Sequence, residues 1–231
     1  MNKLDQIIAK TEGKEPLEVL KELVLFTDEK IVFSTSFGYE DQVIAHLIFN
    51  NNLPINVFTL DTGRLFPETY SVYNSTLNRY KKPIEVFSPN TTKLEKLLTE
   101  KGPFSFYEST ENRIECCNIR KVEPLKRALK GFSIWITGIR AEQSPNRNNM
   151  PMVEWDEANQ IVKVHPLLHW SLNEVKQFIK QNNIPYNPLH DKGFVSIGCQ
   201  PCTRAIKDGE DFRAGRWWWE DANKKECGLH K

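Results

Sequence analysis

The chain has 231 residues, of which 39% are hydrophobic and 26% are charged, and its formal net charge is +1. This composition is typical of a soluble globular protein that is long enough for one sizeable core. No apolar run approaches the roughly 20 residues that cross a bilayer. The near-zero net charge excludes a bulk attraction to nucleic acid or to an anionic membrane, so any anion site must be built locally.

The amino-terminal residues carry no signal-peptide pattern, and we therefore expect a cytoplasmic protein. Thiols stay reduced in that compartment. The five cysteines of the chain thus indicate metal binding or catalysis, and not a disulfide framework.

The first expected elements are two short helices over residues 4–27, in which apolar residues recur at helical spacing. A strand at residues 31–33 follows, and then the small-residue loop Ser34–Gly38 leads into a helix. Backbone N–H groups at a helix N-terminus make an anion site, and the two serine hydroxyls of this loop add donors. The alternative interpretation is an ordinary turn with a serine N-cap.

A second strand over residues 55–60 ends in Asp61-Thr62-Gly63-Arg64, and a helix from Pro67 to Tyr80 follows. Open α/β sheets bind ligands at the carboxyl ends of their strands, where Asp61 and Arg64 would meet a ribose or a phosphate. A turn capped by aspartate, with glycine at positive φ, is the competing interpretation.

Strands and helices continue to alternate, which predicts a largely parallel sheet. The strand that ends at Ile136 leads into Thr137-Gly138-Ile139-Arg140, another strand-end loop that carries an arginine. Ser171 and Glu174 have the spacing of a capping box. The remaining expected elements are strands at residues 84–87, 132–136 and 161–164, and helices at residues 92–101, 125–129 and 171–182.

Four of the cysteines form two pairs, Cys116-Cys117 and Cys199-x-x-Cys202. Four thiolates are the ligand set of a tetrahedral zinc site or of an iron–sulfur cluster. Adjacent side chains diverge by about 100° on a helix, which is awkward for one small ion but suits different irons of a cubane. The spacing therefore favours a [4Fe–4S] cluster over zinc. A redox dithiol, which would need a thioredoxin-like setting, and buried structural cysteines are the alternatives.

The fifth cysteine, Cys227, lies four residues from the end of the chain, between lysines and a histidine. Nearby cations lower the pKa of a thiol, so Cys227 has the surroundings of a nucleophile on a mobile arm. The alternative is that Cys227 is an exposed cysteine near the chain end that has no function. For the run Trp217–Trp219, core packing, lid packing and an aromatic wall all remain open.

Several cations lie beside these motifs and could bind a phosphate or sulfate. Taken singly, each is also compatible with a solvated surface charge. They are Lys121, Arg140, Arg213 and Arg216.

From about Ile31 to His230 the sequence resembles the assimilatory adenylyl-sulfate reductases, the cluster-containing branch of the (phospho)adenylyl-sulfate reductase family. The combination of motifs carries the resemblance, and no single motif does. The motifs are Ser34-Thr35-Ser36-Phe37-Gly38, Leu60-Asp61-Thr62-Gly63, Cys116-Cys117 with Arg120-Lys121 and Pro124, Gly138-Ile139-Arg140, Cys199-x-x-Cys202, Arg213-x-Gly215-Arg216-Trp217 and Glu226-Cys227-Gly228-Leu229-His230.

The resemblance implies an adenine-nucleotide α-hydrolase-like α/β fold with a doubly wound, mostly parallel sheet. We expect one reductase domain over residues 1–231. It would consist of a helical lead-in (residues 1–28), a nucleotide- and cluster-binding core (residues 31–206) and a mobile C-terminal segment (residues 207–231) that carries the nucleophile.

The resemblance also implies the site residues. A [4Fe–4S] cluster would be held by Cys116, Cys117, Cys199 and Cys202, and Cys227 matches the nucleophile. The residues expected to bind substrate are Ser34, Ser36, Phe37 and Gly38 in a phosphate loop, Leu60, Asp61, Thr62, Gly63 and Arg64 in a second loop, and Lys121, Gly138, Arg140, Arg213, Arg216 and His230.

The expected reaction is the reduction of adenylyl sulfate to sulfite and AMP in sulfate assimilation. The Cys227 thiolate would take the sulfuryl group from the nucleotide, and an external thiolate would then release sulfite. The cluster would act structurally or electrostatically. Thioredoxin or a similar dithiol protein is the expected reductant, and a homo-oligomer is left open.

Three alternatives remain. A reductase of 3′-phosphoadenylyl sulfate, or of both nucleotides, is the nearest, although the family members that use the phosphorylated substrate lack the cysteine pairs. An ATP-pyrophosphatase-type enzyme that modifies tRNA would carry a Ser-Gly-Gly-x-x-Ser loop, which this chain lacks. A non-catalytic iron–sulfur sensor or zinc module would leave Cys227 unexplained.

Overall fold

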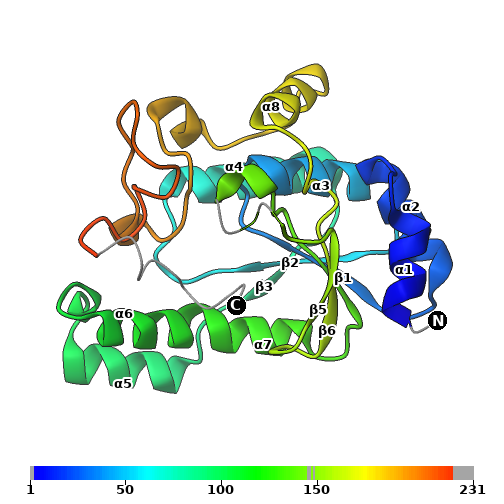
Figure 1. Cartoon of the computed structure of the whole chain (residues 1–231). Coiled ribbons are helices and arrows are strands. Elements are labelled where there is room, and N and C mark those ends of the chain that lie inside the picture. Colours follow the sequence, from blue (N-terminus) through cyan, green and yellow to red (C-terminus); the bar gives the residue numbers. More distant parts are fainter. Residues whose placement is uncertain (1–2, 145–146, 148, 221–231) are drawn as a thin grey trace. The chain divides into compact units, whose positions relative to one another are not determined.

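The computed structural model describes residues 3–144, 147 and 149–220 (Figure 1). The chain divides into two compact units. Unit 1 comprises Met1–Thr59, Glu68–Glu85 and Gly131–Asn187, and unit 2 comprises Leu60–Pro67, Val86–Lys130 and Pro188–Lys231. Within the described ranges, no helix is both long and apolar enough to cross a bilayer.

Unit 1 holds most of the sheet and the helices that cover it. Two of its elements, β2 and α4, extend by one residue into unit 2. Its elements are α1 (Lys3–Thr11), α2 (Pro16–Phe26), β1 (Ile31–Thr35), α3 (Tyr39–Asn50), β2 (Asn56–Leu60), α4 (Pro67–Tyr80), β4 (Ile134–Ile136), β5 (Val153–Asp156), β6 (Ile161–Val164) and α8 (Leu172–Gln181).

The described strands form one six-stranded sheet in the order β3-β2-β1-β4-β6-β5. Strand β1 pairs in parallel with β2 and β4, and β4 pairs in parallel with β6. The central strands are buried apolar runs, as expected when both faces of a parallel sheet are covered. The chain winds outward from β1 to β2 and β3 and returns to β4 on the other side of β1. The predicted doubly wound α/β fold is therefore confirmed.

The helices of unit 1 pack through an apolar core that includes Val43, Ile44 and Val175. Helix α3 contacts α8, and its Gln42 Nε2 donates a 3.0 Å hydrogen bond to Thr76 Oγ1 of α4. Figure 1 shows these three helices on one side of the strands. Leu25 of α2 is apolar, but its side chain is 82% exposed.

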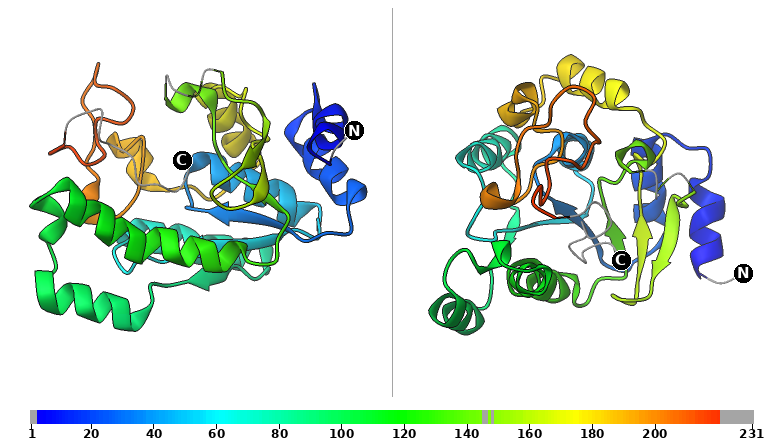
Figure 2. Two further views of the ribbon diagram at one scale, coloured as in Figure 1. Left: turned by 60° about the horizontal axis from the view of Figure 1, so that its bottom comes forward. Right: turned by 60° about the vertical axis from the view of Figure 1, so that its left-hand side comes forward.

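Unit 2 begins at the end of β2 and contains most of β3 (Glu85–Phe87). Its helices are α5 (Thr91–Lys101), α6 (Thr110–Cys117) and α7 (Glu123–Leu129), with a π-helical turn over Asn118–Val122 between the last two. Figure 2 shows α6 and α7 as one continuous rod with α5 beside it. This π-helical turn, which directly follows Cys116 and Cys117, carries Arg120 and Lys121, and these cations oppose burial by lowering the pKa values of Cys116 and Cys199, respectively.

Several boundaries match the sequence. Helix α4 begins at Pro67, and the capping box of α8 forms between Ser171 and Glu174. Strand β5 was not anticipated, and it makes an antiparallel hairpin with β6. The single reductase domain with three segments stays a prediction. Residues 221–231 of its expected C-terminal segment lie outside the described residues.

Candidate functional site

In unit 1, the predicted phosphate loop connects β1 to α3 and is held by its own side chains. Ser34 Oγ accepts a 2.9 Å hydrogen bond from Trp135 Nε1, and Thr35 Oγ1 accepts one from the Phe37 amide. Phe37 adopts a left-handed conformation (φ 62°), and its buried ring stacks on Tyr73. The Phe37 ring therefore packs in the core, and the left-handed backbone of Phe37 turns the chain from the loop into α3.

Asp41, in the first turn of α3, is a central group of this loop that the sequence analysis missed. Its Oδ2 accepts hydrogen bonds from the Ser36 amide (2.6 Å) and from Ser36 Oγ (2.7 Å). Burial raises the pKa of the Asp41 carboxyl from 3.8 to about 6, although the Ser36 hydrogen bonds lower it. Both Ser36 donors are thus engaged by a carboxylate of the chain itself.

Gly138 lies against Asp41 in the loop that follows β4. A Cβ at position 138 would collide with Asp41 Oδ1, so only glycine lets the two loops approach this closely. Strands β1 and β4 lie at the point where the direction of winding reverses. Ligands of open α/β sheets bind at such a switch point, outside the carboxyl ends of the strands, and the predicted phosphate loop and Gly138 lie there.

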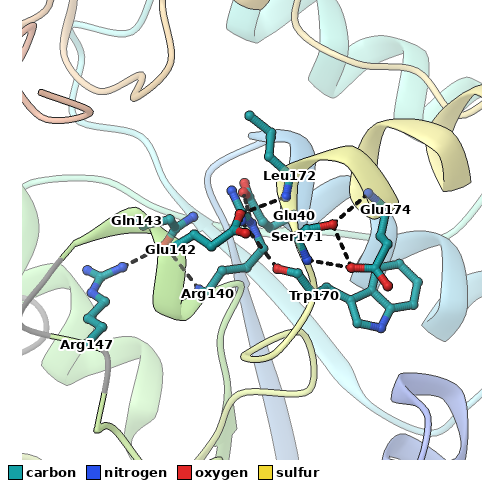
Figure 3. Close-up of polar contacts among 9 residues, drawn as sticks. All are labelled: Glu40, Arg140, Glu142, Gln143, Arg147, Trp170, Ser171, Leu172 and Glu174. Atoms are coloured by element: carbon teal, nitrogen blue, oxygen red, sulfur yellow. Dashed lines mark hydrogen bonds and ion pairs between the residues drawn. The ribbon is translucent and has the colours of Figure 1, made fainter. Parts of the chain in front are cut away.

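Arg140 is completely buried, and two carboxylates hold its guanidinium (Figure 3). Its Nε lies 2.7 Å from Glu40 Oε1, and its Nη1 lies 2.7 Å from Glu142 Oε2. Glu142 Oε2 also accepts a hydrogen bond from the Leu172 amide at the start of α8. Arg140 thus connects the first turn of α3 to the start of α8, and its expected contact with the substrate stays a prediction.

The second predicted loop lies in unit 2 and is fixed to the cysteine segments. Thr62 Oγ1 and the Cys199 thiol are joined by a 3.3 Å hydrogen bond. The carbonyl oxygen of Thr62 accepts a 2.6 Å hydrogen bond from Arg120 Nη1, and that of Arg64 accepts one from the Gln200 amide. Gly63 adopts a positive φ of 69°, as expected from the turn pattern, and its amide donates to Asp61 Oδ1. Leu60 forms the end of β2 just before this turn.

The two predicted cysteine pairs come together in one buried cluster of unit 2. Each of the four side chains is 8–9% exposed, and none is in a disulfide. They pack with Leu97, Phe106 and Trp217. The cysteines are Cys116, Cys117, Cys199 and Cys202.

Burial raises the pKa values of three of these thiols, whereas the cations around them lower these values. Burial alone would raise the pKa of Cys199, but Lys121, the Thr62 hydrogen bond and Arg216 together hold it below the usual 9.0. Burial and the neighbouring Cys199 raise the pKa of Cys202 to about 12, although Arg216 lowers it. Burial likewise raises the pKa of Cys116, against the effects of Arg120 and Arg64.

Arg216 is held tightly beside this cluster. Its guanidinium lies over the Trp217 ring, 4.8 Å from the centroid. A Cβ at position 198 would collide with the same guanidinium, so Gly198, directly before Cys199, makes room for it. Arg213 is half-buried three residues earlier, and its amide donates a 2.8 Å hydrogen bond to Asp211.

Arg113 and Glu220 are further buried charges that the sequence analysis missed. Their side chains are 1% and 5% exposed, and Arg113 Nε lies 2.7 Å from Glu220 Oε1. Arg113 also lies over Trp217 and near Cys117, and the ion pair raises its pKa although burial lowers it. Only its position on the same helix face as the cysteines, three and four residues before them, could have indicated it.

The donor set of this cluster fits an anionic sulfur-ligated group. Among the described residues, the buried atoms Arg64 Nη1, Arg120 Nε and Arg216 Nε make no hydrogen bond. Buried donors and cations need acceptors and negative charge, and an iron–sulfur cluster supplies both through its sulfurs. Within the described ranges, no three His, Cys, Asp or Glu side chains are arranged around a single metal position.

The structure thus assembles the predicted residues in two sets. Unit 1 contains the phosphate loop, Gly138 and Arg140, and unit 2 contains the second loop, the four cysteines, Lys121, Arg213 and Arg216. Cys227 and His230 lie outside the described residues.

The buried position of Asp41 leads to a prediction for stability. Its folded-state pKa of about 6 exceeds 3.8, so the folded protein binds this proton more tightly than the unfolded chain does. Between about pH 4 and pH 7, ionisation of Asp41 should therefore lower the free energy of unfolding. Asp41→Asn removes the ionisable group. As the pH rises across this range, the free energy of unfolding of the variant should therefore increase relative to that of the parent protein by up to about 3 kcal/mol.

Urea denaturation at a series of pH values measures this difference. Asp208→Asn, which changes an exposed carboxylate, is the control and should show no comparable trend. A constant difference between Asp41→Asn and the parent protein from pH 4 to pH 7 would contradict the prediction.

Known proteins share both the sequence pattern and the fold. The model of the phosphoadenosine phosphosulfate reductase domain matches residues 30–205. Adenosine 5′-phosphosulfate reductase of Allochromatium vinosum is 51% identical over 203 residues, which are 88% of this chain and 79% of the relative. The enzyme of the same name from Agrobacterium fabrum is 47% identical over 201 residues, which are 87% of this chain and 77% of the relative.

A solved structure agrees with these sequence matches. The phosphoadenylyl-sulfate reductase from Candida auris, crystallised with phosphate, is 27% identical and superimposes with a TM-score of 0.75 over 89% of this chain and 98% of that chain. The fold and the resemblance inferred from the sequence are thus confirmed. The chain belongs to the phosphoadenosine phosphosulfate reductase domain family.

Proposed function

We propose that the protein reduces adenylyl sulfate to sulfite and AMP in sulfate assimilation. The four buried cysteines favour adenylyl sulfate over 3′-phosphoadenylyl sulfate, because the family members that use the phosphorylated nucleotide are expected to lack the cysteine pairs. Relatives at 47–51% identity that are named adenosine 5′-phosphosulfate reductase support the same choice. The protein is accordingly an oxidoreductase that acts on a sulfur group.

The proposed first step is a nucleophilic substitution at sulfur. The Cys227 thiolate forms a bond to the sulfur of the sulfuryl group. The bond from that sulfur to the bridging oxygen breaks, and AMP leaves with the electron pair. Cys227 then carries an S-sulfonate. Cations that balance the charge on the leaving phosphate accelerate such a step, and Lys121 and Arg216 are the candidates in unit 2.

The second step is thiol exchange with an external dithiol. One thiolate of the reductant attacks Cys227 Sγ, and sulfite leaves with the electron pair of the sulfur–sulfur bond. The second thiol of the reductant then attacks the mixed disulfide and restores the Cys227 thiol. Overall the reductant is oxidised to a disulfide, and the transferred sulfur gains two electrons. We propose thioredoxin or a similar protein in a cytoplasmic setting.

The buried thiols are the proposed ligands of a [4Fe–4S] cluster. When bound, the cluster would supply fixed negative charge and hold the two cysteine segments together. The Thr62 hydrogen bond and Arg120 connect this position to the second nucleotide loop. We propose that this connection aligns the loop for the nucleotide.

Labelled substrate without reductant tests the proposal. Incubation with adenylyl [³⁵S]sulfate should leave one labelled sulfonate per chain on Cys227 and release an equal amount of AMP. Label on any other cysteine, or no label, would overturn the mechanism.

The choice between the two nucleotides needs a separate comparison. The similarity to a solved phosphoadenylyl-sulfate reductase keeps the phosphorylated nucleotide as the second candidate substrate. We expect kcat/KM to be clearly higher for adenylyl sulfate than for 3′-phosphoadenylyl sulfate. Equal values would favour a dual-substrate enzyme, and ATP hydrolysis without sulfite release would favour a nucleotide-activating tRNA enzyme.

A further inference from the structure

The three consecutive tryptophans of unit 2 have different environments. Trp217 is 1% exposed, and the guanidinium groups of Arg113 and Arg216 lie 4.7 and 4.8 Å from its ring centroid. Trp219 packs on Phe106 and Tyr107. Trp218, in contrast, is 40% exposed. Core packing thus explains the first and third tryptophans but not the second.

Trp218 belongs to an exposed group of aromatic rings. Its ring lies 6.2 Å from that of Tyr107, which lies 6.3 Å from that of Phe104. Tyr107 is 40% exposed and Phe104 is 59% exposed. We call Phe104, Tyr107 and Trp218 the aromatic patch. Three large rings exposed next to one another are typical of an interaction site, whereas single exposed apolar residues are ordinary.

The aromatic patch rests on a rigid base. Tyr107 Oη donates a 2.6 Å hydrogen bond to the carbonyl oxygen of Pro201, which lies between Cys199 and Cys202. Beneath it, the buried Phe106 ring contacts Tyr107 at 4.4 Å and is covered by the Arg64 guanidinium at 4.9 Å. Tyr107, the central ring of the aromatic patch, is therefore held in place before any partner binds, which lowers the entropy cost of association.

The position of the aromatic patch in the chain indicates its occupant. Trp218 is followed by Trp219 and Glu220, and Cys227 comes seven residues after Glu220. Seven residues span at most about 25 Å. A protein bound at the aromatic patch is thus within reach of Cys227, and the proposed second step requires such a protein to bring a thiolate to Cys227 Sγ.

We propose that the aromatic patch is the docking surface for the dithiol protein that reduces the Cys227 S-sulfonate. The proposal rests on the proposed function and adds the place at which the reductant binds. Redox partners use small interfaces, and tryptophan and tyrosine are the residues that most often dominate interface energy. A patch of three rings is suited to such a brief, specific contact.

Two single variants test this surface with three separate readouts. They are Phe104→Ala and Trp218→Ala, and both remove exposed rings. The readouts are S-sulfonate formation from adenylyl sulfate without reductant, sulfite release by dithiothreitol, and sulfite release by thioredoxin. Trp155→Ala is the matched control, because Trp155 is 46% exposed but lies on β5 in unit 1.

We expect each variant to raise the KM for thioredoxin about tenfold, the usual effect of removing an interface anchor. Formation of the S-sulfonate and its cleavage by dithiothreitol should be unchanged, because neither needs a docked protein. The control Trp155→Ala should match the parent protein in all three readouts. Unchanged thermal unfolding of the variants would show that the fold is intact.

Other occupants of the aromatic patch predict different results. If the chain's own residues 221–231 cover it during the first step, S-sulfonate formation will slow. If the nucleotide stacks there, the KM for adenylyl sulfate will rise. If a second copy of the chain binds there, sedimentation will show a changed assembly state. Any of these, or an unchanged KM for thioredoxin, overturns the proposal, whereas failure of the parent protein to form an S-sulfonate would refute the proposed function itself.

Discussion

Cys227→Ser is expected to lower sulfite formation from adenylyl sulfate by on the order of a thousandfold or more. The thiolate is the reactive form of cysteine, and a serine hydroxyl ionises far less at neutral pH. Without the nucleophile, the first step stops, so AMP release should fall together with sulfite release. Rapid-quench measurement of AMP and of sulfite checks both effects, and a mass spectrum of the protein should show no S-sulfonate.

The same variant should keep its cofactor and its fold. Cys227 is not one of the four proposed cluster ligands, so the iron content and the free energy of unfolding of the variant should equal those of the parent protein. Cys227→Ala provides a second form without a nucleophile. If either variant still makes sulfite at the full rate, Cys227 is not the nucleophile, and a sensor or a zinc-binding module becomes the better interpretation.

The sequence was sufficient to predict that two candidate loops follow strands of a largely parallel sheet, whereas their role in binding a ligand stays a prediction. Strand-end loops at Ser36 and Gly138 were expected from the alternation of strands and helices, and the sheet order brings them together at the switch point. The paired spacing of the cysteines likewise predicted a shared site. These inferences succeeded because they depend on chain order and on side-chain type, which the sequence states directly.

Long-range partners could not be predicted in the same way. Arg140 was expected at the substrate, yet its guanidinium is engaged by Glu40, one hundred residues earlier, and by Glu142. A sequence shows that an arginine follows a strand, but not which carboxylates will surround it. The left-handed conformation of Phe37 is hidden for a similar reason, because only the buried stack on Tyr73 holds a non-glycine residue there.

Strand β5 was missed because it has only four residues, too few for its alternation of apolar and acidic side chains to stand out. Its Asp156 is buried and lies 2.8 Å from Lys163 of β6, which also contacts Glu154. Alternation also predicts that the apolar residues are the buried ones, whereas in β5 Asp156 is buried and Trp155 is 46% exposed. The ion pairs that keep these carboxylates inside become visible only once the hairpin has formed.

Cys199→Ser is expected to prevent binding of the proposed [4Fe–4S] cluster and to destabilise unit 2. Cys199 is one of four buried thiols, and its Sγ hydrogen-bonds to Thr62 in the second loop. Loss of one thiolate ligand should release the iron. The surrounding cations Arg64, Arg120 and Arg216 would then lose their anionic partner, and removal of one partner from a buried ionic set costs about 3–5 kcal/mol.

Iron and acid-labile sulfide per chain, measured on protein prepared without oxygen, should fall to near zero in Cys199→Ser and stay at the parental level in Cys227→Ser. The midpoint of urea denaturation should fall in the first variant only. Sulfite formation should be lost in both, for different reasons. Cys199→Ser should be unable to align the second loop, whereas Cys227→Ser should bind the nucleotide normally.

Metal analysis of the parent protein decides between the two cofactors that four thiolates can hold. A single zinc ion requires all four sulfurs about 2.3 Å from one point, which Cys116 and Cys117 approach poorly because neighbouring side chains on a helix diverge. A cubane offers each thiolate its own iron, so the diverging pair fits it without unwinding α6. A colourless parent protein with one zinc per chain would contradict the iron–sulfur assignment and leave the cations facing a zinc tetrathiolate.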